Sequence, residues 1–79
     1  MYEADIYVAS ELVTLTRREL EILTLVIEGH ASKEVADILF ISKRTVDFHL
    51  DNVYGKLKVK NKMQALQKAT KLGLIDRAA

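Results

Sequence analysis

Apolar residues recur at helical spacing in four successive stretches of the chain. The clearest stretch has apolar positions three or four residues apart, which form one stripe on a helix: Val46, Leu50, Val53 and Leu57. Shorter stripes are interrupted by polar residues: Leu20, Leu23 and Ile27, then Val35, Ala36 and Leu39, and finally Ala65, Leu66, Ala69 and Leu72. The pattern predicts an all-α, tetrahelical protein whose helices are joined by short connections.

Residues that favour helix ends border these stripes. Thr16 followed by Glu19 predicts a capping box, in which each side chain accepts a hydrogen bond from the backbone N–H of the other residue. The three later helices have candidate N-caps at Ser32, Ser42 and Asn61. Glycines are placed to end the first and fourth helices, at Gly29 and Gly73. The third helix is therefore expected over about 43–57 and the fourth over 61–72.

The first fourteen residues show no sustained period. They are compatible with a short helix, an extended arm or the end of an interdomain linker, and the sequence leaves these alternatives open. The expected organisation is an N-terminal arm or linker over 1–14, one helical domain over 15–75 and a C-terminal tail over 76–79.

The second and third predicted helices are separated by only three residues, Phe40, Ile41 and Ser42. A connection this tight makes two helices cross steeply, as in a helix-turn-helix motif whose second helix enters a DNA major groove. Ile41 is expected to fill the gap between the helices, and Ala36 is small enough to permit their close approach. The motif predicts DNA binding through the third helix.

The charge distribution agrees with this prediction. The whole chain has a net charge of only +1, but residues 43–71 contain eight basic residues and two acidic ones. Such a basic segment is typical of a surface that binds phosphate, although a merely solvated lysine-rich face has the same composition.

The chain has no cysteine, which excludes disulfides and cysteine-ligated zinc. No apolar run has the length of a membrane span and no signal-peptide layout opens the chain, so a cytoplasmic protein without membrane contact is expected.

The segment from Leu15 to Ile75 resembles the LuxR/FixJ/GerE-type helix-turn-helix domain of bacterial transcription regulators. The resemblance covers most of the chain and rests on many markers at matching spacing: Leu15-Thr16-x-x-Glu19, Gly29, Lys33-Glu34-x-Ala36, Ile41-Ser42, Thr45-Val46-x-x-His49, Asn52, Lys56-Leu57, Val59, Ala65 and Gly73-Leu74-Ile75. A chain that consists of nearly only this domain is similar to the stand-alone, GerE-like members. Phe48 beside His49 looks more like the autoinducer-responsive branch, although no ligand-binding domain of that branch is expected within these 79 residues.

The resemblance implies a sequence-specific regulator that binds double-stranded DNA at a pseudo-palindromic site. It further implies a homodimer formed through the fourth helix (61–72), with RNA polymerase as a further partner. No cofactor is implied. The residues expected to contact DNA lie mainly on the third helix and its borders: Lys33, Lys43, Arg44, Thr45, Asp47, Phe48, Asp51, Asn52, Lys56 and Lys58. The residues expected to hold phosphates, which position a protein without reading sequence, are Lys56, Lys58, Lys60 and Lys62.

Asp47 and Asp51 depart from the family pattern, in which many relatives carry basic or small polar residues at these places. The two acids are one helical turn apart, so both approach a polyanion if that face meets DNA. Asp47 can pair with Lys43 or Arg44, which lie four and three residues before it. Otherwise each carboxylate either accepts a hydrogen bond from a cytosine amino group or repels DNA. The last case favours an alternative function, a protein-interaction module on a helix-turn-helix scaffold with weak or no DNA binding.

The remaining polar residues give no indication of catalysis or metal binding. His49 is expected to be a partly buried, hydrogen-bonded structural residue, because only His30 is available as a second imidazole ligand. Ser42, His49 and an aspartate lie on or beside one helix, without signs of an oxyanion hole. Phe48 is expected either to touch a thymine methyl group or to pack against an adjacent helix. The sequence thus predicts a binding protein and no enzyme.

Overall fold

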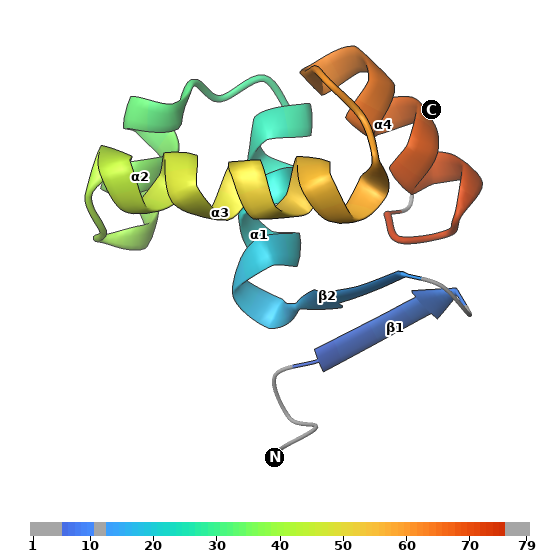
Figure 1. The fold of residues 1–79 in the computed structure, drawn as a ribbon. Helices are drawn as coiled ribbons and strands as arrows, with labels where there is room; N and C mark the ends of the chain where they lie inside the picture. Colours follow the sequence, from blue (N-terminus) through green and yellow to red (C-terminus); the bar gives the residue numbers. More distant parts are fainter. Residues whose placement is uncertain (1–5, 11–12, 76–79) are drawn as a thin grey trace.

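The computed structural model describes residues 6–10 and 13–75, with side chains from residue 14 onward, and within these ranges it consists of four helices and a small hairpin (Figure 1). The strands are β1 (Ile6–Ser10) and β2 (Val13–Thr16). The helices are α1 (Arg17–Ile27), α2 (Ser32–Leu39), α3 (Lys43–Leu57) and α4 (Lys62–Lys71). The predicted four-helix, mostly helical fold is confirmed.

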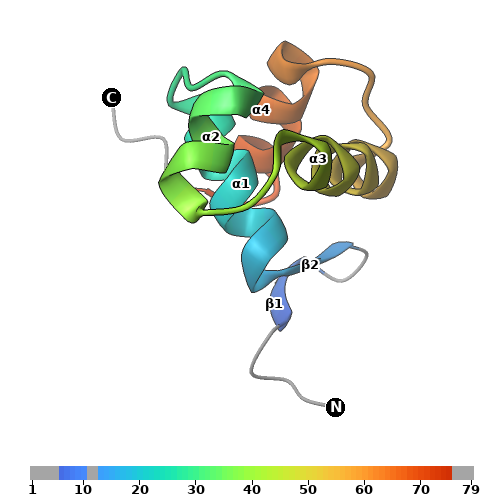
Figure 2. The same cartoon turned by 90° about the vertical axis from the view of Figure 1, so that its left-hand side faces the viewer.

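The segment that the sequence left open forms an antiparallel hairpin. Ile6 lies opposite Thr16 and Tyr7 opposite Leu15, and the register shifts between Val8 and Ser10. The hairpin runs directly into α1 and projects from one end of the helical body (Figures 1 and 2). Leu15 is fully buried and anchors β2 to the helices. The outer part of the predicted arm (1–5), residues 11–12 and the predicted tail (76–79) lie outside the described residues.

The core consists of two apolar clusters, and α3 contributes to both of them. One cluster joins β2, α1, α3 and α4 through Leu15, Leu23, Val53, Leu57, Ala65, Ala69 and Leu74. The other joins α1, α2 and α3 through Ile22, Val26, Val35, Ala36, Val46 and Leu50. The predicted stripe of α3 is therefore buried along its whole length, which orients the opposite face of this helix toward solvent.

Most predicted helix ends are confirmed by hydrogen bonds. Thr16 and Glu19 form the reciprocal capping box, with distances of 3.0 and 3.1 Å. Ser42 Oγ accepts from the Thr45 N–H, and Asn61 Oδ1 accepts from the Gln64 N–H. The glycines that end α1 and α4 have φ angles of +111° and +77°, a region in which side chains with a Cβ are strained.

One predicted cap is wrong. Ala31 and not Ser32 is the N-cap of α2, and Ser32 is already the first helical residue. Ala31 has no side-chain acceptor, so the cap is only half formed: the Ala31 N–H donates to Glu34 Oε1 at 2.9 Å.

The turn between α2 and α3 is built on a left-handed residue. Phe40 has φ and ψ angles of 59° and 43°, and 93% of its surface is exposed. Ile41 turns back toward the core and packs against the α1–α2–α3 cluster, as expected from the sequence. The Ile41 N–H donates to the Ala36 carbonyl at 3.0 Å, which closes the end of α2.

Replacing Phe40 by glycine is expected to stabilise the protein by roughly 0.5–1 kcal/mol. A left-handed conformation is unfavourable for residues with a Cβ, and the exposed ring loses little packing when removed. Phe40→Ala is the matched control, because alanine removes the ring but keeps the strained Cβ. Urea unfolding of the three proteins measures the effect. A glycine variant no more stable than the alanine variant would contradict this account of the turn.

Candidate nucleic-acid interface

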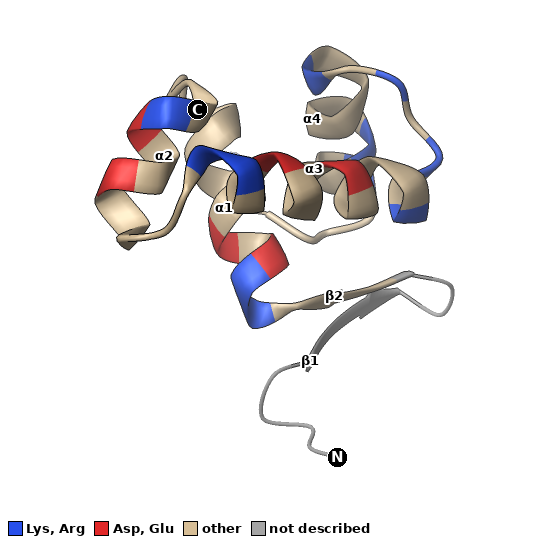
Figure 3. Ribbon diagram, turned by 60° about the vertical axis from the view of Figure 1, so that its left-hand side comes forward, with Lys and Arg blue, Asp and Glu red and all other residues tan. Residues whose placement is uncertain are grey.

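The face of α3 opposite its buried stripe, with its two edges, carries seven of the ten residues that the sequence singled out. Four of them, Arg44, Phe48, Asp51 and Asn52, are exposed near the middle of this face. At 3.6 residues per turn, Thr45, Asp47 and Lys56 fall at its edges, whereas Lys43 lies beyond the Asp47 edge, closer to the buried stripe. Figure 3 shows basic residues at the start of α3, acidic residues along its middle, and basic residues again at its end. The predicted residues are therefore gathered on one accessible surface.

The first turn of α3 is ordered by its own side chains. Ser42 Oγ accepts the Thr45 N–H at 3.0 Å and donates to Thr45 Oγ1 at 2.9 Å. The backbone N–H groups of Lys43 and Arg44 precede the first internal bond of the helix, which the Val46 N–H donates to the Ser42 carbonyl. Unpaired N–H groups at a helix N-terminus attract anions, and here they lie beside two cationic side chains. This end of α3 is suited to hold a phosphate.

Asp47 is held at the edge of the surface by two partners. Lys43 Nζ lies 2.7 Å from Asp47 Oδ2, one helical turn away. Hydrogen bonding to Lys43, and secondarily to the Ser32 hydroxyl of α2, lowers the pKa of the Asp47 carboxyl below its ordinary value. Asp47 is therefore ionised near neutral pH, and it links the start of α2 to α3.

Asp51 is in a different situation. It is exposed, and within residues 14–75 no basic side chain forms an ion pair with it. Burial of the Tyr54 ring, followed by the nearby negative charge of Asp51, raises the pKa of the Tyr54 hydroxyl. Tyr54 itself packs against both core clusters, as expected for a residue at the edge of the core.

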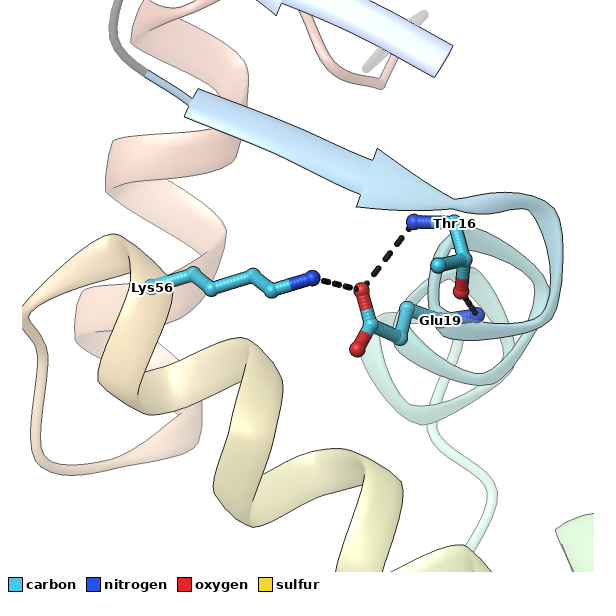
Figure 4. A network of polar contacts seen from close by, with 3 residues as sticks. All are labelled: Thr16, Glu19 and Lys56. Atoms are coloured by element: carbon cyan, nitrogen blue, oxygen red, sulfur yellow. Dashed lines mark hydrogen bonds and ion pairs between the residues drawn. The ribbon is translucent and has the colours of Figure 1, made fainter. Parts of the chain in front are cut away.

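Lys56 has an intramolecular partner that the sequence did not indicate. Its Nζ lies 2.6 Å from Oε1 of Glu19, a carboxylate whose side chain is only 6% exposed. The same oxygen accepts the Thr16 N–H, so one buried carboxylate joins the capping box of α1 to the end of α3 (Figure 4). The sequence had identified Glu19 only as a capping residue. That Lys56 also contacts DNA stays a prediction.

The other predicted lysines are exposed on neighbouring segments. Lys33 lies in the first turn of α2, and Lys58 ends α3 in a left-handed conformation with φ of 59°. Lys60 follows Lys58 in the connection to α4, Lys62 is the first residue of α4, and both are exposed. Exposed cations thus lie on α2 and after the end of α3, where they are available to contact a phosphate backbone.

The aromatic residues of α3 differ in part from the expectations. Phe48 is 62% exposed, and its one ring contact in the described residues is an edge-on contact with His49 at 5.8 Å, so it does not pack on an adjacent helix. His49 is partly buried, as expected; its Nδ1 has no hydrogen-bond partner among the described protein residues, and a hydrogen bond of this side chain stays a prediction. The His49 ring lies edge-on to that of Phe48. Across the described ranges, no group of three His, Asp or Glu residues is placed to hold a metal ion, and no helix is long and apolar enough to cross a membrane.

Comparison with known proteins places this surface in context. Residues 13–69 match the bacterial regulatory proteins of the luxR family. The transcriptional activator protein SolR of Ralstonia nicotianae is 51% identical over 61 residues, which make up 77% of this chain and 26% of SolR. The oxygen regulatory protein NreC of Staphylococcus carnosus is 42% identical over 62 residues, 78% of this chain and 29% of NreC. The chain thus spans less than a third of the length of these curated relatives.

The fold agrees with the same assignment. The solved structure of the transcription factor GerE is 35% identical, has a TM-score of 0.74 and is matched over 78% of this chain and 92% of its own. The response regulator ChrA of a heme-sensing two-component system is 41% identical, with a TM-score of 0.75, over 77% of this chain and 30% of ChrA. The family match covers more than half of the chain and both cores of the fold. The chain therefore belongs to the luxR family of bacterial regulatory proteins and carries the helix-turn-helix DNA-binding domain of its transcription regulators.

Proposed function

We propose that the protein regulates transcription by inserting the outward face of α3 into the major groove of a specific DNA site. The observation that carries this proposal is the exposed face itself, which holds Arg44, Phe48, Asp51 and Asn52 opposite a continuous buried stripe. Lys43 and the N-terminus of α3 contact the phosphates on one side of the groove. Lys58, Lys60 and Lys62 contact the phosphates on the other side. Binding a phosphate requires Lys43 to leave or share its contact with Asp47.

The proposal extends to a homodimer on a pseudo-palindromic site, formed through α4. Met63 supports this assembly, because it is a large apolar side chain on α4 that is 62% exposed. A two-fold dimer presents two copies of α3 to successive turns of one DNA face, so its two half-sites are inverted repeats. Light scattering of the protein, alone and with DNA, measures the assembly. RNA polymerase as a partner and a cytoplasmic location belong to the same proposal.

Alanine variants of Lys43 and Arg44 are each expected to weaken DNA binding about tenfold in 0.1 M salt. Each removes one cation from the phosphate-facing turn, so the slope of log affinity against log salt should also decrease by about 0.9. The measurement is a gel-shift titration, at several salt concentrations, of a site selected from a random DNA library. Arg18→Ala is the matched control, because Arg18 is a cation of α1 with a 41% exposed side chain, outside both α3 and the helix proposed to form the dimer.

Two outcomes would contradict the proposal. Variants of Lys43 and Arg44 that bind as tightly as the unmodified protein would show that the first turn of α3 does not face DNA. Failure of the unmodified protein to select any sequence would favour the alternative function, a protein-interaction module on the same scaffold.

A further inference from the structure

The two acidic residues of α3 are equivalent in the sequence pattern but not in the structure. Asp47 lies at the edge of the outward face, where Lys43 Nζ is 2.7 Å from its carboxylate. Asp51 lies near the middle of the face, is exposed, and has no ion-pair partner in the described residues. Only Asp51 therefore presents an unoccupied carboxylate to a ligand docked on α3.

A second feature of the same face indicates a close approach by another molecule. Gly55 lies one turn after Asp51, at an exposed position inside α3, where glycine is unfavourable for helix stability. Apart from its chain neighbours and the backbone of α3 itself, a Cβ built on Gly55 would have no atom within 4 Å, and the residue does not have a positive φ. Neither internal packing nor backbone conformation therefore requires glycine at position 55. A DNA duplex that lies close against this turn would require it, because a Cβ would occupy the space between the helix and the duplex.

The chemistry of the major groove restricts what an unoccupied carboxylate can contact. Guanine and thymine present acceptors that repel it, and adenine presents its amino group beside the N7 acceptor. Cytosine presents an N4 amino donor alone, which a carboxylate accepts. The exposed Phe48 ring lies one turn before Asp51, so a groove that receives this face of α3 would have an apolar ring beside the carboxylate.

We propose that Asp51 determines sequence specificity by accepting a hydrogen bond from a cytosine amino group, with Gly55 permitting the approach of the duplex. Asp47 is a positioning residue that holds Lys43 and does not read a base. This inference rests on the proposed function, because it assumes that α3 occupies the major groove.

The test is selection of bound sequences from a random DNA library by the full chain and three variants. The unmodified protein is expected to select cytosine at one position of its site. Asp51→Asn should lose this cytosine preference, or change it to adenine, and bind the original site about ten- to a hundredfold more weakly. Asp47→Asn is the matched control: it should keep the selected sequence and change affinity uniformly. Gly55→Ala should unfold at a higher urea concentration and yet bind the site at least tenfold more weakly.

The outcomes separate the inference from the function on which it rests. An Asp51→Asn variant that keeps the selected sequence and binds more tightly would show that the acid only repels DNA, while the proposed function stands. A Gly55→Ala variant with undiminished affinity would overturn the close approach that base reading requires. If the unmodified protein selects no sequence at all, the proposed function and this inference fail together.

Discussion

Truncating Leu57 to alanine is expected to destabilise the protein by about 2–5 kcal/mol. Leu57 is fully buried at the end of α3, in the cluster that joins α1, α3, α4 and β2. The loss combines the transfer free energy of the removed atoms with the cost of the cavity left behind. A domain of this size has little stability in reserve, so a large fraction of the variant is expected to be unfolded at physiological temperature.

Urea unfolding followed by circular dichroism measures this effect. Ile38→Ala is the matched control, because Ile38 is also a large aliphatic residue of a helix but is 45% exposed. The control is expected to lose less than about 1 kcal/mol. Equal losses in the two variants would mean that Leu57 is not part of a close-packed core.

Replacing Lys56 by methionine is expected to destabilise the protein by about 2 kcal/mol, although the removed charge lies near the surface. The change leaves the Glu19 carboxylate buried without its cationic partner, which had been 2.6 Å away. Breaking a fully buried pair costs about 3–5 kcal/mol, and the smaller figure here allows for the partial exposure of Lys56. The Thr16 N–H still donates to Glu19, so the capping box persists in part.

The control for this prediction is Lys60→Met, which removes an exposed lysine side chain with no ion pair in the described residues. Adding Glu19→Gln to Lys56→Met should recover part of the lost stability, because the uncompensated charge is then removed. Equal stability of the Lys56 and Lys60 variants would disprove the structural role of the ion pair. A Lys56 variant that is destabilised but binds DNA normally when folded would show that Lys56 does not contact phosphate.

The sequence by itself determined the helices and most of their ends. Helical periodicity is a local property, and the stripe from Val46 to Leu57 is buried as the spacing predicted. The capping box at Thr16 and the glycines at positions 29 and 73 depend on contacts within a few residues, so they too were predictable. The error at Ser32 has a local reason. Serine is a favoured N-cap residue, so the sequence predicted the cap at Ser32, whereas the N-cap is the preceding residue, Ala31, which has no side-chain acceptor.

Tertiary structure decided the features that depend on distant segments. The contact between Glu19 and Lys56 joins residues 37 positions apart, and neither residue type nor local spacing indicates it. The hairpin over residues 6–16 was left open, because a two-stranded pair is marginal alone and depends on anchoring by buried residues such as Leu15.

In the candidate site too, some features follow from local spacing and others from the packing of distant segments. The sequence placed Asp47 and Asp51 one turn apart on α3, because a helix fixes that spacing. The same local spacing places Lys43 four residues before Asp47, and this pair, 2.7 Å apart, leaves Asp51 as the carboxylate without an ion pair in the described residues. Local geometry thus fixed which residues share the outward face of α3. The packing of α1 and α2 against the opposite side of α3, which brings together groups that are separate in the chain, decided which face of this helix is left exposed.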